Sequence, residues 1–174
     1  MTNPSNPTMP STPEFLSWQE VEKLIDYILP QLRGPYDALM LITRGGIVPG
    51  GLIAEALEMR YVLTAAVQFP EAGQARLAWP MFLQFPEDRL LRDKKILIID
   101  DIWANGRTIT TVKGRVLAAG GRAEAAVLHY KPGSNLFREA GPDYYAAVTD
   151  RFIVYPWEVQ RGPDEFNTRV PRFN

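Results

Sequence analysis

Residues Ile96–Ile99 are four consecutive branched apolar residues, and two acids, Asp100 and Asp101, follow them directly. A strand that is apolar on both faces is buried on both sides, which is typical of a parallel sheet covered by helices. The end of such a strand lies at the edge of the sheet where open α/β folds bind their ligands. This stretch therefore predicts both a fold class and the place of a binding site.

The rest of the chain alternates helix and strand patterns. Apolar residues recur at helical spacing after Ser17, over residues 48–58 and over residues 108–119. Strands are predicted over residues 37–42, 61–69, 95–99, 123–130, 144–148 and 152–155. We therefore expect an α/β fold with a mainly parallel twisted sheet flanked by helices.

The length of 174 residues suits a domain with a core of its own. Residues 1–13 have a proline at every third position from Pro4 and no charged side chain, which predicts a disordered tail. Residues 14–174 are expected to form one domain. Within it, residues 70–93 show no regular period and are predicted to be a mobile lid loop.

The composition excludes several kinds of chemistry. The chain has no cysteine and a single histidine, which excludes a thiolate nucleophile, a cysteine-ligated metal centre and a multi-histidine metal site. Its 19 basic and 20 acidic residues argue against nucleic-acid binding through bulk charge. No segment approaches the ~20 apolar residues of a membrane-spanning helix. The N-terminus also lacks a signal-peptide pattern, so a cytoplasmic protein is expected.

The turn after the acid pair has the composition of a phosphate site. It leads into a helix start, where unpaired backbone N–H groups attract anions. The predicted phosphate contacts are Ala104, Asn105, Gly106, Arg107 and Thr108. Asp100 and Asp101 can accept hydrogen bonds from sugar hydroxyls or hold a hydrated divalent cation. An isolated acid pair is more often part of a turn, but the glycine and threonine beside this one favour a ligand.

The strand, acid pair, glycine and threonine together resemble the ribose-phosphate signature of type I phosphoribosyltransferases, and further motifs extend the resemblance over residues 36–158. Thr43-Arg44-Gly45-Gly46 resembles the pyrophosphate loop of the xanthine–guanine and hypoxanthine branch. In that role the arginine offers a charged donor and the glycines let backbone N–H groups approach phosphate. The resemblance also implies a cis peptide bond between Thr43 and Arg44.

Two later motifs resemble the base-binding parts of 6-oxopurine enzymes. The Lys131-Pro132 step implies that the Lys131 ammonium contacts the exocyclic oxygen of a purine. Residues 150–158 imply that Phe152 stacks on the purine, that Ile153 contacts it through its backbone, and that Glu158 helps to place metal and pyrophosphate. The simpler alternatives are a solvated lysine at a strand end and an aromatic residue in a core or interface.

One position departs from the pattern of the 6-oxopurine enzymes. They usually have an aspartate, the proposed general base, where this chain has Ala104, which cannot carry a proton. Adenine phosphoribosyltransferases have an alanine there. Three explanations compete: another group serves as the base, the nucleobase differs, or the activity is weaker.

The resemblance implies a Mg²⁺-dependent purine phosphoribosyltransferase of purine salvage, whose substrates are phosphoribosyl pyrophosphate and a 6-oxopurine. Asp100 and Asp101 are then the catalytic residues and, with Glu158, the metal ligands. The resemblance also implies a small hood formed by the terminal segments, with residues 149–174 in it, and a homodimer or homotetramer.

Two alternatives stay open. The first is transfer of phosphoribose to adenine or another nucleobase. Ala104 favours it, and Lys131 opposes it because an ammonium offers no acceptor to an amino group. The second is a non-catalytic regulator that senses phosphoribosyl pyrophosphate or nucleotides. Such regulators carry an added DNA-binding domain or a basic face, and neither is evident in this sequence.

Overall fold

The structure is a computed structural model that describes residues 12–70, 80–137 and 139–159. It divides into two compact units: the chain up to Trp18 together with the chain from Arg151, and the chain from Gln19 to Asp150. The expectation of a single domain over residues 14–174 stays a prediction. The terminal segments contribute β1 and β8, which pair with each other in a two-stranded sheet separate from the larger sheet.

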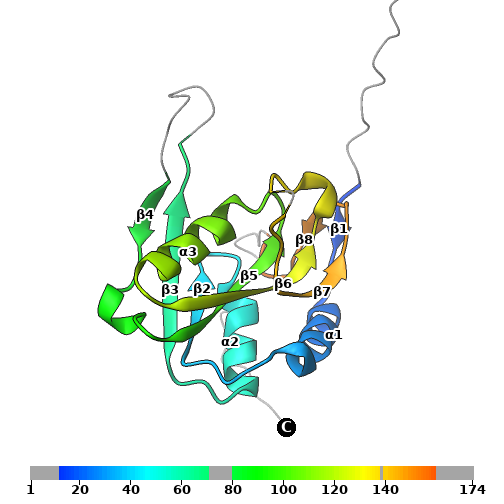
Figure 1. Cartoon of the computed structure of the whole chain (residues 1–174). Helices are drawn as coiled ribbons and strands as arrows, with labels where there is room; N and C mark the ends of the chain where they lie inside the picture. Colours follow the sequence, from blue (N-terminus) through cyan, green and yellow to red (C-terminus); the bar gives the residue numbers. More distant parts are fainter. Residues whose placement is uncertain (1–11, 71–79, 138, 160–174) are drawn as a thin grey trace, which may run out of the picture. The chain divides into compact units, whose positions relative to one another are not determined.

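The larger unit is built on a six-stranded sheet with the strand order β4-β3-β2-β5-β6-β7 (Figure 1). The strands are β2 (Ala38–Ile42), β3 (Val62–Gln68), β4 (Met81–Gln84), β5 (Lys95–Trp103), β6 (Arg122–Tyr130) and β7 (Tyr144–Val148). Every neighbouring pair is parallel except β3 and β4, which are antiparallel. The predicted mainly parallel sheet is confirmed.

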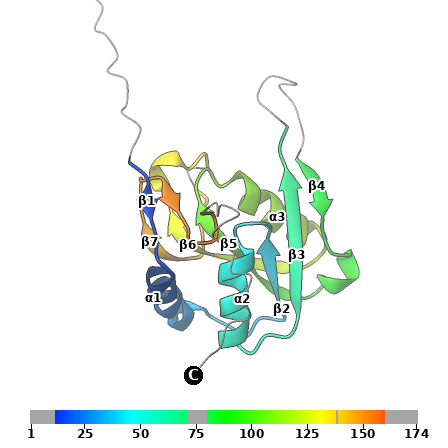
Figure 2. The ribbon, with the colours of Figure 1, turned by 180° about the vertical axis from the view of Figure 1, so that it is seen from behind.

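Helices α2 (Ile47–Ala56) and α3 (Arg107–Ala118) cover opposite faces of this sheet (Figures 1 and 2). Helix α1 (Trp18–Ile28) precedes β2, and the described residues also form three short 3₁₀ helices. They are η1 (Leu29–Gln31), η2 (Asp88–Leu90) and η3 (Pro132–Ser134). Among the described residues, no helix has both the length and the apolar composition needed to span a membrane.

The main core lies between α3 and the sheet. All four residues of Ile96–Ile99 are completely buried, which explains why this strand is apolar on both faces. Helix α3 contributes Ile109, Val112 and Val116, spaced three and four residues apart so that they share one side of the helix. Burying each of these side chains stabilises the fold by about 1.5–3 kcal/mol.

The structure differs from the sequence predictions at one strand boundary and in one segment. Strand β5 does not end at Ile99, because Ile102 and Trp103 continue the parallel pairing with His129 and Tyr130 of β6. The acid pair consequently lies inside the strand and is held by its hydrogen-bonded ladder.

The second difference concerns the segment 70–93 that was predicted to be a lid loop. It contains β4 and η2, so the loop prediction is wrong for these residues. Phe82 packs against the core while Met81 and Leu83 are exposed, the alternation of a sheet-edge strand that is half buried. Residues 71–79 of the predicted lid lie outside the described residues.

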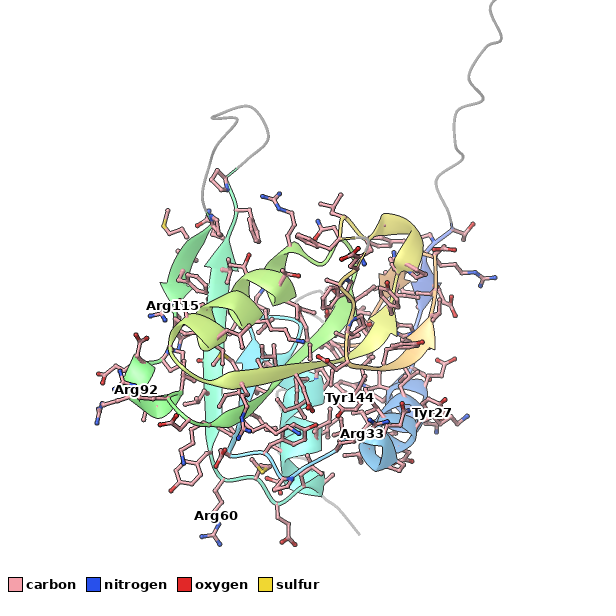
Figure 3. All side chains as sticks on the ribbon, in the orientation of Figure 1. Tyr27, Arg33, Arg60, Arg92, Arg115 and Tyr144 are labelled. Carbon is pink, nitrogen blue, oxygen red and sulfur yellow. The ribbon has the colours of Figure 1, made fainter. Side chains whose placement is uncertain are left out.

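At the edge of the larger sheet opposite the acid pair, the strands begin in a polar network. Figure 3 shows Tyr144 beside Arg33, whose backbone N–H donates a hydrogen bond to the tyrosine hydroxyl at 3.2 Å. The Glu124 carboxylate accepts hydrogen bonds from the Tyr36 and Tyr144 hydroxyls at 2.6 and 2.9 Å, and the Lys95 ammonium lies 3.0 Å from it. This network fixes the starts of β5, β6 and β7.

The smaller unit is a two-stranded parallel sheet of β1 (Glu14–Phe15) and β8 (Ile153–Val154). Beyond it, Trp157 stacks on Tyr155 with ring centroids 4.7 Å apart. The tail predicted over residues 1–13 lies outside the described residues except at its last two positions, as do residues 160–174. The hood role expected of residues 149–174 stays a prediction.

Candidate functional site

The acid pair near the end of β5 is withdrawn from water. Asp101 is only 7% exposed, and its backbone N–H donates to Asp100 Oδ1 at 3.0 Å. Burial of the Asp100 carboxyl, and then the neighbouring charge of Asp101, raise its pKa well above the usual 3.8. The N–H groups of Asp101 and Gly46 offset this only in part. A ligand that brings positive charge or hydroxyl donors relieves the repulsion between the two acids.

The loop between β2 and α2 lies directly against these acids. A Cβ atom added to Gly45 would be 2.5 Å from the Asp101 carboxylate, and one added to Gly46 would be 2.2 Å from the Ile99 carbonyl oxygen. Only glycine therefore lets the loop approach β5 this closely. The structure brings the predicted pyrophosphate loop and the predicted sugar-binding acids together at one edge of the sheet.

The same loop presents donors to an anion. The Thr43–Arg44 peptide bond is cis, as the resemblance implied. The Arg44 side chain is exposed, and its guanidinium has no hydrogen-bond or ion-pair partner within the described parts of the chain. Helix α2 begins immediately afterwards, at Ile47, without a side-chain cap, so its positive end is open to an anion.

The turn that follows β5 forms the second half of the site. Gly106 has φ +79°, which favours glycine, and a Cβ atom on it would be 2.6 Å from Trp103 Nε1. Gly106 is the N-cap residue of α3, and it has no side chain with which to cap the helix start. A cavity of about 220 Å³, lined by residues 100–106, Thr108 and Ile109, lies at this turn. It is much larger than the ~30 Å³ share of one water molecule, so it can admit a phosphoryl group.

Two predicted phosphate contacts are already engaged. The Asn105 Oδ1 atom accepts a hydrogen bond from the Arg107 backbone N–H at 3.0 Å. The Arg107 guanidinium lies over the ring of Phe69, 4.3 Å from its centroid. A phosphate at this turn would therefore meet the Arg107 N–H only after the Asn105 side chain turns away.

Lys131 stands at the same edge, one strand further along the sheet. It follows β6, and its backbone N–H donates to the Trp103 carbonyl at 2.9 Å. Its side chain is partly exposed, and its ammonium has no hydrogen-bond or ion-pair partner among the residues that the structure describes. This lysine is therefore free to meet a ligand near the phosphate turn.

Sequence reasoning missed Trp103 and Asn135. Trp103 is 1% exposed, and its Nε1 atom donates to Asn135 Oδ1 at 3.1 Å. A tryptophan two positions after the acid pair is a visible signal, because so large a ring needs a buried surface. Asn135 carries no comparable signal, since its partners become neighbours only when the chain folds.

Phe152, Ile153 and Glu158 all belong to the smaller unit. Phe152 is 58% exposed and Ile153 is buried. The exposed Glu158 accepts a hydrogen bond from the Tyr155 backbone N–H at 2.9 Å, so part of its carboxylate closes a local turn. The base-binding and metal roles expected of these residues stay predictions.

Within the described residues, no three acidic or histidine side chains gather closely enough to hold a metal ion. The buried Asp101 carboxylate and the half-buried Asp100 carboxylate, beside two helix starts, nevertheless make an edge that can hold a sugar phosphate. A mainly parallel sheet covered by helices, with this edge, makes the larger unit an α/β fold that can bind a phosphorylated ligand.

A family model narrows this class. The model of the phosphoribosyl transferase domain matches residues 11–161, and the chain belongs to that family. The family named from the sequence motifs is thereby confirmed.

Individual relatives point the same way. The chain is similar to the xanthine-guanine phosphoribosyltransferase of Cereibacter sphaeroides, with 31% identity over 128 residues that cover 72% of this chain and 71% of the relative. It is 29% identical over 136 residues to the enzyme of that name from Roseobacter denitrificans, covering 72% and 70%. Among solved structures, the purine phosphoribosyltransferase from Pyrococcus horikoshii Ot3 matches with a TM-score of 0.72 and 26% identity, covering 92% of this chain and 99% of the other.

Proposed function

We propose that the protein is a purine phosphoribosyltransferase. It transfers the phosphoribosyl group of phosphoribosyl pyrophosphate to a 6-oxopurine and releases pyrophosphate. The bond between C1 of the ribose and the pyrophosphate oxygen breaks, a bond from C1 to a purine nitrogen forms, and that nitrogen loses its proton. The observation that carries the proposal is the contact of Gly45 with Asp101, which unites the loop for the leaving group with the acids for the sugar.

The described residues suit the charges of this reaction. Positive charge develops on the sugar as the pyrophosphate departs, so the protein must stabilise the leaving group and hold the sugar in line. Arg44 and the backbone of Gly45-Gly46 offer donors to the pyrophosphate. Asp100 and Asp101 accept hydrogen bonds from the ribose hydroxyls, and residues 104–108 hold the 5′-phosphate.

Lys131 favours a 6-oxopurine over adenine, since its ammonium donates to a carbonyl oxygen and cannot accept from an amino group. The names of the curated relatives support the same choice. Phe152 and Ile153 keep their proposed roles toward the purine, which are stacking and backbone contact respectively.

The acid pair also fits Mg²⁺. Both side chains offer carboxylate oxygens, and a cation there counters the burial and the neighbouring Asp101 charge that together raise the Asp100 pKa. Mg²⁺ usually takes one or two protein carboxylates together with substrate phosphates and water, so two carboxylates suffice. When bound, the ion neutralises charge on the departing pyrophosphate, and Glu158 is proposed to assist. We also expect a cytoplasmic homodimer or homotetramer whose partners are small molecules, not nucleic acid or membrane.

A second candidate is transfer to adenine, which Ala104 favours because adenine phosphoribosyltransferases have alanine at this position. The deciding experiment measures pyrophosphate release from phosphoribosyl pyrophosphate and Mg²⁺ with hypoxanthine, guanine, xanthine and adenine in parallel. Turnover with an oxopurine and not with adenine supports the main proposal, and the reverse supports the second. Tight binding of phosphoribosyl pyrophosphate without turnover for any base would indicate a non-catalytic sensor instead.

A further inference from the structure

Two loops of the larger unit are joined beneath the candidate site. The first is the phosphate turn, residues 104–106, which follows β5. The second is the Lys131 loop, residues 131–137, which follows β6. Each carries one proposed contact for a different end of a nucleotide: phosphate for the first loop and purine for the second. The contacts that fix the distance between the two loops therefore help to determine which ligand can reach both loops.

The Trp103 side chain is the floor of the phosphate turn. Gly106 passes directly over the indole, since a Cβ atom on this glycine would be 2.6 Å from Nε1 and 2.8 Å from Cε2. The edge of the indole also meets the Tyr130 ring, with centroids 6.5 Å apart and planes at 88°. The turn cannot sink toward the core, because the completely buried ring fills the space below it.

The Asn135 carboxamide holds the second loop to this floor. Its Oδ1 atom accepts from Trp103 Nε1 at 3.1 Å and from the Phe137 N–H at 3.3 Å. Its Nδ2 atom donates to the Ala140 and Phe137 carbonyl oxygens at 2.6 and 2.9 Å. The carboxamide is thus saturated on both sides, which fixes its orientation and with it the course of the loop.

Two backbone hydrogen bonds add to this connection. The Leu136 N–H donates to the Asn105 carbonyl at 3.1 Å, and the Lys131 N–H donates to the Trp103 carbonyl at 2.9 Å. The two loops therefore share one hydrogen-bonded frame. Within it the Trp103–Asn135 bond joins two side chains, and Asn135 Nδ2 also donates to the Tyr130 hydroxyl at 3.3 Å.

We propose that Trp103 and Asn135 are positioning residues that fix the distance between the purine contact of Lys131 and the phosphate turn. This inference rests on the proposed function, since it assigns those two contacts to one nucleotide. A ligand that reaches both contacts gains affinity from a preset separation, whereas a ligand that uses the phosphate turn alone gains nothing from it.

The test compares two probes, guanosine 5′-monophosphate and ribose 5-phosphate, by calorimetric titration of the full chain. Trp103→Phe keeps an aromatic floor but removes the N–H. We expect it to weaken guanosine 5′-monophosphate by about five- to tenfold, the value of one hydrogen bond, and to leave ribose 5-phosphate within about twofold. The matched control is Tyr145→Phe. The Tyr145 ring contacts the Tyr130 ring but takes no part in the Trp103–Asn135 hydrogen bond. It is expected to change neither affinity.

Asn135→Ala provides a second variant if Trp103→Phe does not fold, because the asparagine is only partly buried. It is expected to give the same selective loss. Equal losses for both probes, or none for either, would overturn the positioning role. If the wild-type protein binds neither probe, the proposed function itself is wrong, so the two failures are distinguishable.

Discussion

Gly45 and Asp101 come from different strand ends and are so close that a Cβ atom on the glycine would be 2.5 Å from the carboxylate. Real Cβ atoms are essentially never found at that separation, so any other residue must push the loop or the acid aside. The contact ties the position of the pyrophosphate loop to that of the acid pair. Several measurable effects follow from this arrangement and from its neighbours.

The first prediction concerns this contact. Gly45→Ala is expected to lower kcat/KM by about 100-fold, because a shift of ~1 Å between reacting groups costs that much. Overpacking should also lower the free energy of unfolding by about 1–3 kcal/mol. Steady-state kinetics and urea denaturation measure the two effects.

Gly51→Ala is the matched control, since a Cβ atom at Gly51 meets nothing within 4 Å. It lies within α2, where alanine should stabilise the helix by about 0.5–1 kcal/mol and leave kinetics unchanged. If both alanine variants were equally active, the contact with Asp101 would have no part in catalysis.

Asp101→Asn is the second prediction. The amide keeps the shape of the side chain but removes its charge, so turnover should fall by about 10²–10³-fold while the fold is retained. Stopped-time assays measure the turnover, and circular dichroism checks that the fold is retained. Asp26→Asn, on an exposed face of α1, is the control. Kinetics like those of the wild-type protein would remove the acid pair from the mechanism.

The third prediction separates the two substrates. Lys131→Ala should raise the KM for the purine by about 10–100-fold, the value of a hydrogen bond from a charged group, and should barely change the KM for phosphoribosyl pyrophosphate. Lys23→Ala, an exposed lysine in α1, should change neither constant. An equal rise in both constants would contradict the assignment of Lys131 to the base.

The fourth prediction is that a substitution at Ala104 increases catalytic activity. It lines the cavity at the phosphate turn and lacks the carboxyl that 6-oxopurine enzymes usually have there. Ala104→Asp should raise kcat with an oxopurine by about tenfold or more, since a placed general base contributes 10²–10⁴-fold. The pH profile of kcat should gain a limb that reports the new carboxyl. Lower turnover in this variant would show that another group already accepts the proton.

The fifth prediction concerns stability at the opposite sheet edge. Burial raises the pKa of Glu124, but hydrogen bonds from Tyr36, Lys95 and Tyr144 outweigh it and hold the pKa below the usual 4.5. The charged form therefore stabilises the fold fully above pH 4.5, and this contribution is lost as the pH falls through the lowered value.

Glu124→Gln should accordingly lower the free energy of unfolding by about 1–3 kcal/mol at pH 7, with the difference shrinking in acid. Urea denaturation across this pH range measures it, with Glu22→Gln on an exposed face of α1 as the control. A difference that stays constant with pH would show that the carboxylate charge is not involved.

The sequence was informative wherever a local pattern has one physical solution. The apolar run before Asp100 requires a strand buried on both faces, and the glycines of the Arg44 loop require a close approach. The sequence was uninformative where partners lie far apart in the chain. Strand β4 is short and bounded by Pro80 and Pro86, so its pairing with β3 decided its structure more than its own residues did.

The same distinction holds within the site. Asp101, Gly106 and Lys131 stand in motifs and could be named in advance. Trp103 and Asn135 depend on a contact across 32 positions of sequence, and no pattern in either segment indicates it. Likewise, the hydrogen bond between Glu158 and the Tyr155 N–H gives that acid a local structural role that its motif did not suggest.

Arg107 is the first residue of α3, and no acid stands in that turn. A cation at this end opposes the helix macrodipole, which costs a few tenths of a kcal/mol when the turn is empty. An anion bound at the start of α3 turns this cost into a gain, because the guanidinium and the peptide dipoles then both attract the anion. The affinity of this turn for an anion should therefore decline as ionic strength rises. The start of α3 should also fray less once the anion is bound.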